Sequence, residues 1–268
     1  MLRVYCIFHL SRLKYICEHY REEKQPRTAW LPADMGRKKY TDAERVSMIS
    51  MFVKTTREII DTEGIDQVTI RKVAKLCGYN SATLYHYFDD VDELITLSCI
   101  SYLEDYCRAW AQELKVARNA YDTYILTWEL YGKYAFMYPH IFNRIFFYNH
   151  RKPLSDSIRL YYEVFPDQLE NISGAINDML RGGSLVERDY PVLKPLADSG
   201  LIRHEDITLI SVLAICHFRS LLEQKCALGD EVNNDQLIWS QTDALRFLLH
   251  KARGVEPLPP DGGPFQRF

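Results

Sequence analysis

The spacing of apolar residues constrains the fold most strongly, because a helical period continues from Thr41 almost to the C-terminus. In the first stretch, to about Thr62, the apolar residues that recur on one helical face are Val46, Ile49, Phe52, Val53, Ile59 and Ile60. Thr41 and Glu44 have the spacing of a capping box, and Gly64 ends the stretch. No segment alternates with the two-residue period of a strand over a useful length, so we predict an all-α protein.

The same period predicts short helices at about 69–76 and 81–87. A fourth helix opens at Asp90, with Glu93 three residues later, and continues towards Lys115. An aromatic-rich helix runs from Ala120 to Tyr138, and a short helix follows Pro139 to about Tyr148. These boundaries predict six helices before residue 150.

Helical pattern resumes at residue 155, is interrupted at 166 and reaches 180. Residues 184–205 contain Pro191, Pro195 and Gly200, so we expect broken structure there. Two strongly amphipathic helices are predicted at about 206–228 and 235–252. The tail from 254 is rich in proline and glycine, which predicts disorder.

Charge is distributed unevenly along the chain, although the formal net charge is only −3. Residues 1–40 carry nine Lys/Arg against four Asp/Glu, whereas residues 41–96 carry six against ten. Nucleic-acid binding would therefore depend on a local basic arm, for which the candidates are Arg37, Lys38 and Lys39.

The seven cysteines include no C-x-x-C pair, and no Cys/His cluster has zinc-ligand spacing. Free thiols in a reducing cytoplasm fit best, and we expect no metal and no cofactor. No apolar run approaches the roughly 20 residues that span a bilayer, so we expect no membrane partner. Motifs of phosphate-binding loops, serine hydrolases and zinc proteases are absent from the sequence, which argues against an enzyme.

Residues 69–88 have the spacing of a helix-turn-helix. Ala74 supplies a small residue where two helices nearly touch, and Gly78 tolerates a left-handed turn. Leu84 supplies the apolar residue that holds the second helix down. Thr69 and Asn80 are suitable N-caps for the two short helices. Taken alone, this spacing is only moderately specific for the motif.

A wider pattern surrounds the motif. It consists of Gly64, Val73-Ala74, Gly78, the run Thr83-Leu84-Tyr85-x-Tyr87-Phe88, and Asp92-Glu93-Leu94. This pattern resembles the TetR-like family of bacterial transcription regulators, closely over about residues 45–96 and beyond them only in architecture. The resemblance implies an N-terminal three-helix DNA-binding domain with a helix-turn-helix, followed by a larger helical domain for ligand binding and dimerisation.

Four segments follow from this organisation. We expect residues 1–34 to be an N-terminal extension, which either forms a short amphipathic helix that ends before Pro26 or lies upstream of the true start at Met35. Residues 35–89 are the helix-turn-helix domain, residues 90–253 are the regulatory and dimerisation domain, and residues 254–268 are the tail.

The second short helix would present its N-terminal residues to base edges in the major groove. The candidates for this readout are Asn80, Ser81, Ala82, Thr83 and His86. By resemblance, Tyr85 would contact a phosphate, as would Thr69 at the N-terminus of the preceding helix, and Arg71 lies near the DNA backbone.

Two positions depart from the family. Val91 stands where the family commonly has a lysine, and Ser81 and Ala82 stand where it often has lysine and glycine. Both departures remove phosphate contacts, so non-specific affinity would depend more on the basic arm.

Aromatic residues gather in 121–148, eleven of them in twenty-eight positions. An aromatic cavity between helices would hold an apolar or aromatic small-molecule effector, and the alternative is that these side chains simply fill the core. The candidate lining residues are Tyr124, Trp128, Tyr131, Phe142 and Phe146.

The last two helices carry apolar faces that would form a four-helix bundle in a homodimer, unless they pack within one chain. These faces are formed by Ile207, Ile210, Leu213, Phe218, Leu221, Leu222, Leu237, Ile238, Leu245, Leu248 and Leu249.

The sequence thus predicts a cytoplasmic dimer that binds palindromic double-stranded operator DNA and is released by a small molecule. The alternative is a helix-turn-helix adaptor that acts mainly through protein contacts, without ligand response. Effector identity, operator sequence and the choice between repression and activation are not readable from the sequence.

Overall fold

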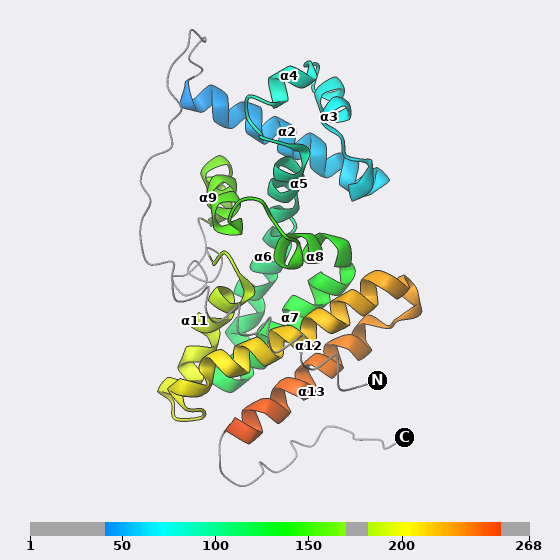
Figure 1. Cartoon of the computed structure of the whole chain (residues 1–268). Helices are drawn as coiled ribbons and strands as arrows, with labels where there is room; N and C mark the ends of the chain where they lie inside the picture. The colour runs from blue at the N-terminus through cyan, green and yellow to red at the C-terminus, as the bar shows by residue number, and fades with distance from the viewer. Residues whose placement is uncertain (1–40, 170–181, 253–268) are drawn as a thin grey trace. The chain divides into compact units, whose positions relative to one another are not determined.

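The computed structural model describes residues 41–169 and 182–252, and within these ranges every regular element is a helix (Figure 1). The all-α prediction is confirmed. The basic arm at Arg37, Lys38 and Lys39, the extension 1–34, the tail 254–268 and the helical pattern at 170–180 lie outside the described residues. No described helix is long and apolar enough to cross a membrane.

Helix α2 (Asp42–Glu63) begins and ends where the sequence predicts. The Thr41 hydroxyl accepts a hydrogen bond from the Glu44 amide at 3.2 Å, and the Glu44 carboxylate accepts one from the Thr41 amide at 2.8 Å. Gly64 ends the helix at a φ of +94°, a conformation that side chains other than glycine rarely adopt. Both ends are therefore fixed by local chemistry.

Helices α3 (Ile70–Leu76) and α4 (Ser81–Leu84) follow, and α4 is shorter than predicted. The amides of Tyr87 and Phe88 both donate to the Leu84 carbonyl, at 2.9 and 3.0 Å, which closes a turn. This turn brings Phe88 into the core against Phe52, with ring centroids 6.2 Å apart. Burial of Phe88 thus ends the helix three residues early.

The predicted fourth helix is divided into α5 (Val91–Ile100) and α6 (Leu103–Glu113). At the division, the Ser101 hydroxyl donates to the Ser98 carbonyl at 2.6 Å and accepts from the Arg57 guanidinium at 2.7 Å. Tyr102 donates its hydroxyl proton to Asp61 at 2.5 Å. Polar groups of α2 therefore hold the chain where it leaves the helical path.

The remaining helices form the body of the protein. They are α7 (Ala120–Met137), α8 (Pro139–Phe147), α9 (Leu154–Val164), α11 (Leu185–Asp198), α12 (Ile207–Leu228) and α13 (Asn234–Ala252). Short 3-10 turns lie at Ile65–Gln67, Leu114–Val116, Pro166–Leu169, His204–Asp206 and Gly229–Glu231. Helix α7 packs against α6, α8, α11, α12 and α13, so it lies at the centre of the body.

The prediction of broken structure at 184–205 is wrong as far as Asp198, because α11 continues through Pro191 and Pro195, whereas the predicted break at Gly200 is present, with a φ of +75°. Neither proline can donate a helical hydrogen bond, and each costs helix stability. Against this cost, the buried side chains Val192, Leu193 and Leu196 belong to the hydrophobic core, where α11 packs against α7 and α12. Packing therefore outweighs the local preference.

Candidate functional site

Helices α3 and α4 form a helix-turn-helix whose two N-termini are capped by side chains. Thr69 accepts a hydrogen bond from the Lys72 amide at 3.2 Å, and Asn80 accepts from the Thr83 amide at 2.9 Å. Gly78 has a φ of +76°, the left-handed conformation that the turn requires. The N-caps and the glycine fix the path of the backbone from α3 into α4.

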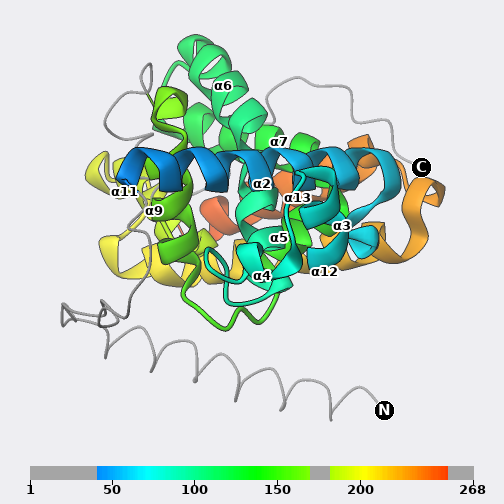
Figure 2. The same ribbon diagram turned by 90° about the horizontal axis from the view of Figure 1, so that it is seen from above.

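The contact between the two helices is closed and apolar. Ala74 is buried on α3, and Leu84, fully buried, anchors α4. Phe52 of α2 lies beneath them, 5.9 Å from the Tyr79 ring and 5.6 Å from the Tyr87 ring. We call α2, α3 and α4 the head; Figures 1 and 2 show α3 and α4 beside each other next to α2.

The predicted DNA-contact residues of the head share one property, which is access to solvent. Those exposed are Thr69, Arg71, Asn80, Ala82, Tyr85 and His86, and those half-buried are Ser81 and Thr83. Tyr85, which follows α4 directly, exposes 57% of its surface, as a phosphate contact would require. The DNA-contact assignments stay predictions.

Three further head residues lie near this surface and were not predicted as contacts. Lys75, Leu76 and Tyr79 are exposed in the last turn of α3 and in the connecting turn. Leu76 exposes 61% of its surface although it is apolar. Lys72, by contrast, pairs with Glu63 and is not among the candidates.

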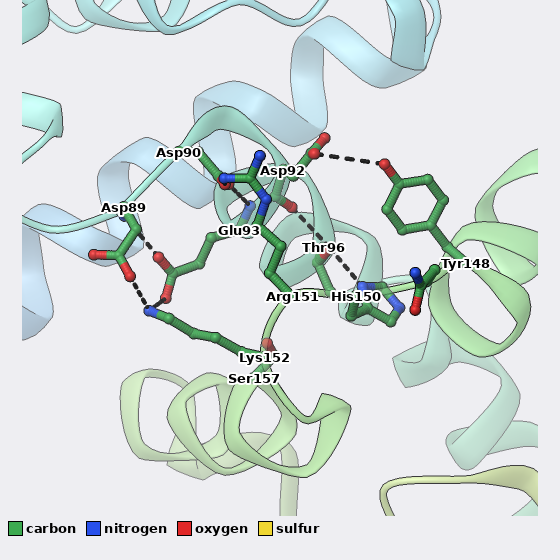
Figure 3. Close-up of a pocket in the computed structure, with 11 residues that line it drawn as sticks. Asp89, Asp90, Asp92, Glu93, Thr96, Tyr148, His150, Arg151, Lys152 and Ser157 are labelled. Carbon is green, nitrogen blue, oxygen red and sulfur yellow. Dashed lines mark hydrogen bonds and ion pairs between the residues drawn. The ribbon is translucent and has the colours of Figure 1, made fainter.

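Helix α5 is tied to the body by ion pairs at its N-terminus (Figure 3). Asp90 caps the helix and pairs with Arg151 at 2.9 Å, while Lys152 bridges Asp89 and Glu93 at 2.7 and 2.8 Å. These cations lie in the segment between α8 and α9. Around them is a polar pocket of about 250 Å³. We call this set of ion pairs the junction.

A second set of contacts links α5 to α8. Arg144 of α8 pairs with Asp92 at 2.7 Å, and its guanidinium stacks 3.7 Å from the centre of the Tyr148 ring. Helix α5 also packs against α2. A displacement of α8 would therefore reach the head through α5.

The aromatic residues predicted to line an effector cavity pack into one cluster. Tyr124 and Phe142 are fully buried, and Tyr131 lies 5.7 Å from Trp128 and 6.0 Å from Phe146, measured between ring centroids. Of these five, Trp128 and Tyr131 line a cavity whose volume is about 30 Å³. That is room for about one water molecule.

The remaining walls of this cavity were missed by sequence reasoning. They are Tyr106 of α6, Thr127 of α7, and Leu185, Arg188 and Asp189 of α11. Arg188 and Asp189 are each only 6% exposed. Two adjacent charged residues between the apolar positions of α11 could have indicated this site. Because the prolines predicted broken structure there, sequence reasoning did not expect a helix that buries them.

The Asp189 carboxylate accepts hydrogen bonds from the Trp128 indole N–H at 3.0 Å and from the Tyr124 hydroxyl at 3.3 Å. Burial raises its pKa to about 6, although these donors oppose the rise. The hydroxyl of Tyr131 is buried and makes no hydrogen bond to the residues that the structure describes. The cavity thus combines a buried carboxylate, an unpaired hydroxyl and aromatic rings.

The predicted dimerisation faces lie partly inside the chain. Their members buried within it are Ile207, Ile210, Phe218, Leu222, Leu237, Leu245 and Leu249. Other sides of the same two helices expose apolar residues: Leu209 and Leu213 on α12, and Trp239 and Phe247 on α13. Trp239 exposes 61% of its surface. Two neighbouring helices therefore present apolar side chains to solvent.

Comparison with known proteins supports the assignment of the head. Residues 52–96 match the family model described as bacterial regulatory proteins, tetR family. The match covers the end of α2, the helix-turn-helix and the first turns of α5. No curated protein sequence matches the chain significantly.

Solved structures share the fold at low sequence identity. FadR of Thermus thermophilus, a TetR-family transcriptional repressor in complex with lauroyl-CoA, matches with a TM-score of 0.54 at 13% identity, over 81% of this chain and 100% of its own. The fatty acid degradation regulator FadR of Bacillus halodurans gives a TM-score of 0.46 at 13% identity, over 78% of this chain and 96% of its own. The first likeness supports the fold, and the second is too weak to support an argument.

Proposed function

The chain carries the helix-turn-helix domain of the tetR family of bacterial regulatory proteins, and we propose that it works as a transcriptional repressor released by a small molecule. One observation carries the proposal: capped helices and Gly78 hold the exposed residues of α4 in the arrangement of a recognition helix. A helix presented in this way fits the major groove.

The proposed target is a palindromic operator. Base readout is assigned to Asn80, Ser81, Ala82, Thr83 and His86, and backbone contacts to Thr69, Arg71 and Tyr85. All of these side chains reach solvent. Two heads related by a two-fold axis would read half-sites about one helical turn apart.

Fluorescence anisotropy with duplex DNA tests this proposal. Tyr85→Ala should weaken binding to all sequences, whereas Thr83→Val should change the preference between sequences. Removal of Arg37, Lys38 and Lys39 should make binding less salt-dependent, by about 0.9 in the slope for each lost phosphate contact. Parent-like binding by both point variants would contradict the placement of the recognition helix.

The dimer is assigned to α12 and α13. Exposed Leu213 and Trp239 supply apolar surface on two adjacent helices, as a four-helix bundle across a two-fold axis needs. Trp239→Glu should yield a folded monomer in analytical ultracentrifugation and weaken operator binding. Val116→Glu, at a position 71% exposed and outside these helices, is the matched control.

The effector is assigned to the aromatic cluster of Tyr124, Trp128, Tyr131, Phe142 and Phe146, and its skeleton is apolar or aromatic. Because the cavity holds about 30 Å³, a ligand must separate α7 from α11. Helix α8 packs on α7 and holds α5 through Arg144, which gives a route from the cavity to the head. Binding must then be reciprocal, so operator DNA weakens effector binding by the same factor.

The competing function is an adaptor that uses the head for protein contacts. A salt-dependent mobility shift with duplex DNA would separate the two, because phosphate contacts release counterions and most protein contacts do not. Absence of any shift at low salt would favour the adaptor.

A further inference from the structure

The charge state of the cavity gives information on the effector that the aromatic cluster alone does not. Asp189 is buried, and the side chains whose hydrogen bonds lower its pKa, those of Ser211, Trp128 and Tyr124, are all neutral. No cation in the described part of the chain is among the groups that shift its pKa. The carboxylate therefore has no positive partner there.

Such a carboxylate is costly to keep ionised. Burial raises its pKa to about 6, so at neutral pH the group is mostly charged in surroundings that disfavour the charge. A buried charge is stabilised most effectively by an opposite charge close to it. The fold supplies hydrogen bonds but no such charge to Asp189.

Arg188 is the nearest charged neighbour in sequence, but its guanidinium is directed elsewhere. Its Nε donates to the Gly182 carbonyl at 3.0 Å, and the guanidinium lies 5.1 Å from the centre of the Phe146 ring. Its charge lowers the pKa values of Tyr131 and Tyr106, but it does not shift the pKa of Asp189. The carboxylate thus forms a negative side of the cavity.

The aromatic part of the cavity suits a cation. The rings of Tyr106, Trp128 and Tyr131 line it, and aromatic faces attract positive charge, whereas the Arg188 guanidinium, which also lines the cavity, is held at the Gly182 carbonyl. The Tyr131 hydroxyl, in a side chain 5% exposed, has no hydrogen-bond partner among the described residues and can accept an N–H donor. An unpaired buried hydroxyl and an uncompensated carboxylate therefore line the same small space.

We propose that the effector carries a protonated nitrogen on an aromatic or apolar skeleton, and that Asp189 and the Tyr131 hydroxyl receive this nitrogen. The inference rests on the proposed effector function and specifies its chemical class. The ammonium group donates hydrogen bonds to the carboxylate and the hydroxyl, while the skeleton enters between α7 and α11. The same charge that is costly without ligand then contributes to affinity.

Three matched probes test the proposal on the full chain by isothermal titration calorimetry at pH 8. They are 2-naphthylmethylammonium, neutral 2-naphthylmethanol and anionic 2-naphthoate. We expect the ammonium probe to bind about ten-fold tighter than the alcohol, and the carboxylate probe to bind most weakly. The ammonium probe should also weaken operator binding in the same samples.

Three variants locate the preference. Asp189→Asn should lower the affinity for the ammonium probe about ten-fold, to that of the alcohol. Tyr131→Phe should lower it several-fold. Asp198→Asn, an exposed carboxylate on the same helix, is the matched control and should change nothing. If Asp189→Asn fails to fold, Tyr131→Phe and the three probes on the parent chain still test whether the cavity prefers a protonated nitrogen.

Several outcomes would overturn the inference. The first is that the ammonium probe does not bind at concentrations up to about 1 mM. The second is that the ammonium and alcohol probes bind with equal affinity. The third is that naphthoate or lauroyl-CoA binds more tightly than the ammonium probe. Any of these would leave the DNA-binding proposal intact if the parent chain still binds its operator. Loss of operator binding by the parent would instead contradict the proposed function itself.

Discussion

The head and the body hold their functional groups in opposite ways. In the head, Asn80 and Tyr85 point into solvent from a short helix whose backbone is fixed by caps and by Gly78. In the body, Asp189 and Tyr131 are buried in a cavity formed where α6, α7 and α11 meet. Under the proposed function, the head binds DNA without rearrangement, whereas the body opens to admit a ligand.

This difference suggests how the two regions divide the work. A surface that reads DNA needs a rigid backbone, because base contacts tolerate little displacement. A sensor needs two conformations of similar free energy. A buried charge raises the free energy of the closed conformation and so reduces the free-energy difference between the closed and the open one. Substitutions in the head should therefore act on DNA affinity, and substitutions in the cavity should act on stability and on ligand response.

The largest expected effect comes from Ala74→Leu, where α3 and α4 pack together. Ala74 is buried, so a larger side chain must displace α4, at a cost of about 1 to 3 kcal/mol. Operator affinity should fall by at least about ten-fold, because displaced base contacts cost about 1 to 3 kcal/mol each. Anisotropy with operator DNA measures this loss.

Ala43→Leu is the matched control, because Ala43 is exposed on α2. The near-ultraviolet circular dichroism of Ala74→Leu should resemble that of the parent, because the three tryptophans that the structure describes, Trp110, Trp128 and Trp239, all lie outside the head. A changed tryptophan signal would mean that head and body are not independent, and the comparison between them would fail.

The next largest effect is the pH dependence produced by Asp189. Its pKa in the folded chain is about 6, above the ordinary 3.8, so the folded state binds more protons between these values. The free energy of unfolding therefore falls as pH rises through this window, by roughly 3 kcal/mol from this group. Asp189→Asn should remove that dependence. Between pH 4 and pH 8, the free energy of unfolding of the variant should therefore rise relative to that of the parent.

Chemical denaturation of both proteins across this pH range measures the difference between their free energies of unfolding. The contributions of other titrating groups cancel in this difference. The tyrosines near Asp189 do not interfere, since burial raises the pKa values of Tyr106, Tyr124 and Tyr131. Arg188 stays charged throughout. An unchanged difference between pH 4 and pH 8 would show that Asp189 is not buried as a carboxylate.

A smaller effect is expected at the contact between α5 and α8. Arg144 is 14% exposed and Asp92 41% exposed, so their ion pair should couple by about 1 kcal/mol, more than a fully exposed pair. A double-mutant cycle with Arg144→Met and Asp92→Asn measures this coupling from urea unfolding. The exposed i,i+4 pair of Arg219 and Glu223 is the control, with about 0.3 to 0.5 kcal/mol expected. Equal coupling free energies for the two pairs would mean that the Arg144–Asp92 pair holds α5 to α8 no more strongly than an ordinary surface ion pair does.

Much of the head was predictable from sequence because its structure depends on neighbours in the chain. Thr69 and Asn80 cap helices that begin one residue later, and Gly78 lies in the turn between them. Capping and turn chemistry act over three or four residues, so they can be read directly from the sequence. The error at the end of α4 arose because Phe88 packs on Phe52, thirty-six residues away.

The cavity was only half predictable for the opposite reason. Trp128 and Tyr131 stand out in an aromatic-rich segment, but Asp189 joins them from sixty residues away through tertiary packing. Pro191 and Pro195 predicted broken structure there, and the burial of Leu193 and Leu196 outweighed that local signal. Contacts between distant helices leave no periodic trace in the sequence.

The smallest effects come from one substitution made in both regions, Tyr85→Phe in the head and Tyr131→Phe in the body. Neither hydroxyl makes a hydrogen bond to the described residues: Tyr85 is 57% exposed, and the Tyr131 hydroxyl is buried without a partner among them. Each variant should therefore change the free energy of unfolding by less than about 0.5 kcal/mol. Differential scanning fluorimetry suffices to measure this.

The two variants should differ in what they lose, and this tests the comparison at its finest level. Tyr85→Phe removes a proposed phosphate contact, so operator affinity should fall several-fold while ligand response is kept. Tyr131→Phe should keep operator affinity and weaken the response to the ammonium probe. If Tyr131→Phe instead destabilised the chain by more than about 1 kcal/mol, its hydroxyl would be hydrogen-bonded in solution. The cavity would then be a satisfied core rather than a site awaiting a ligand.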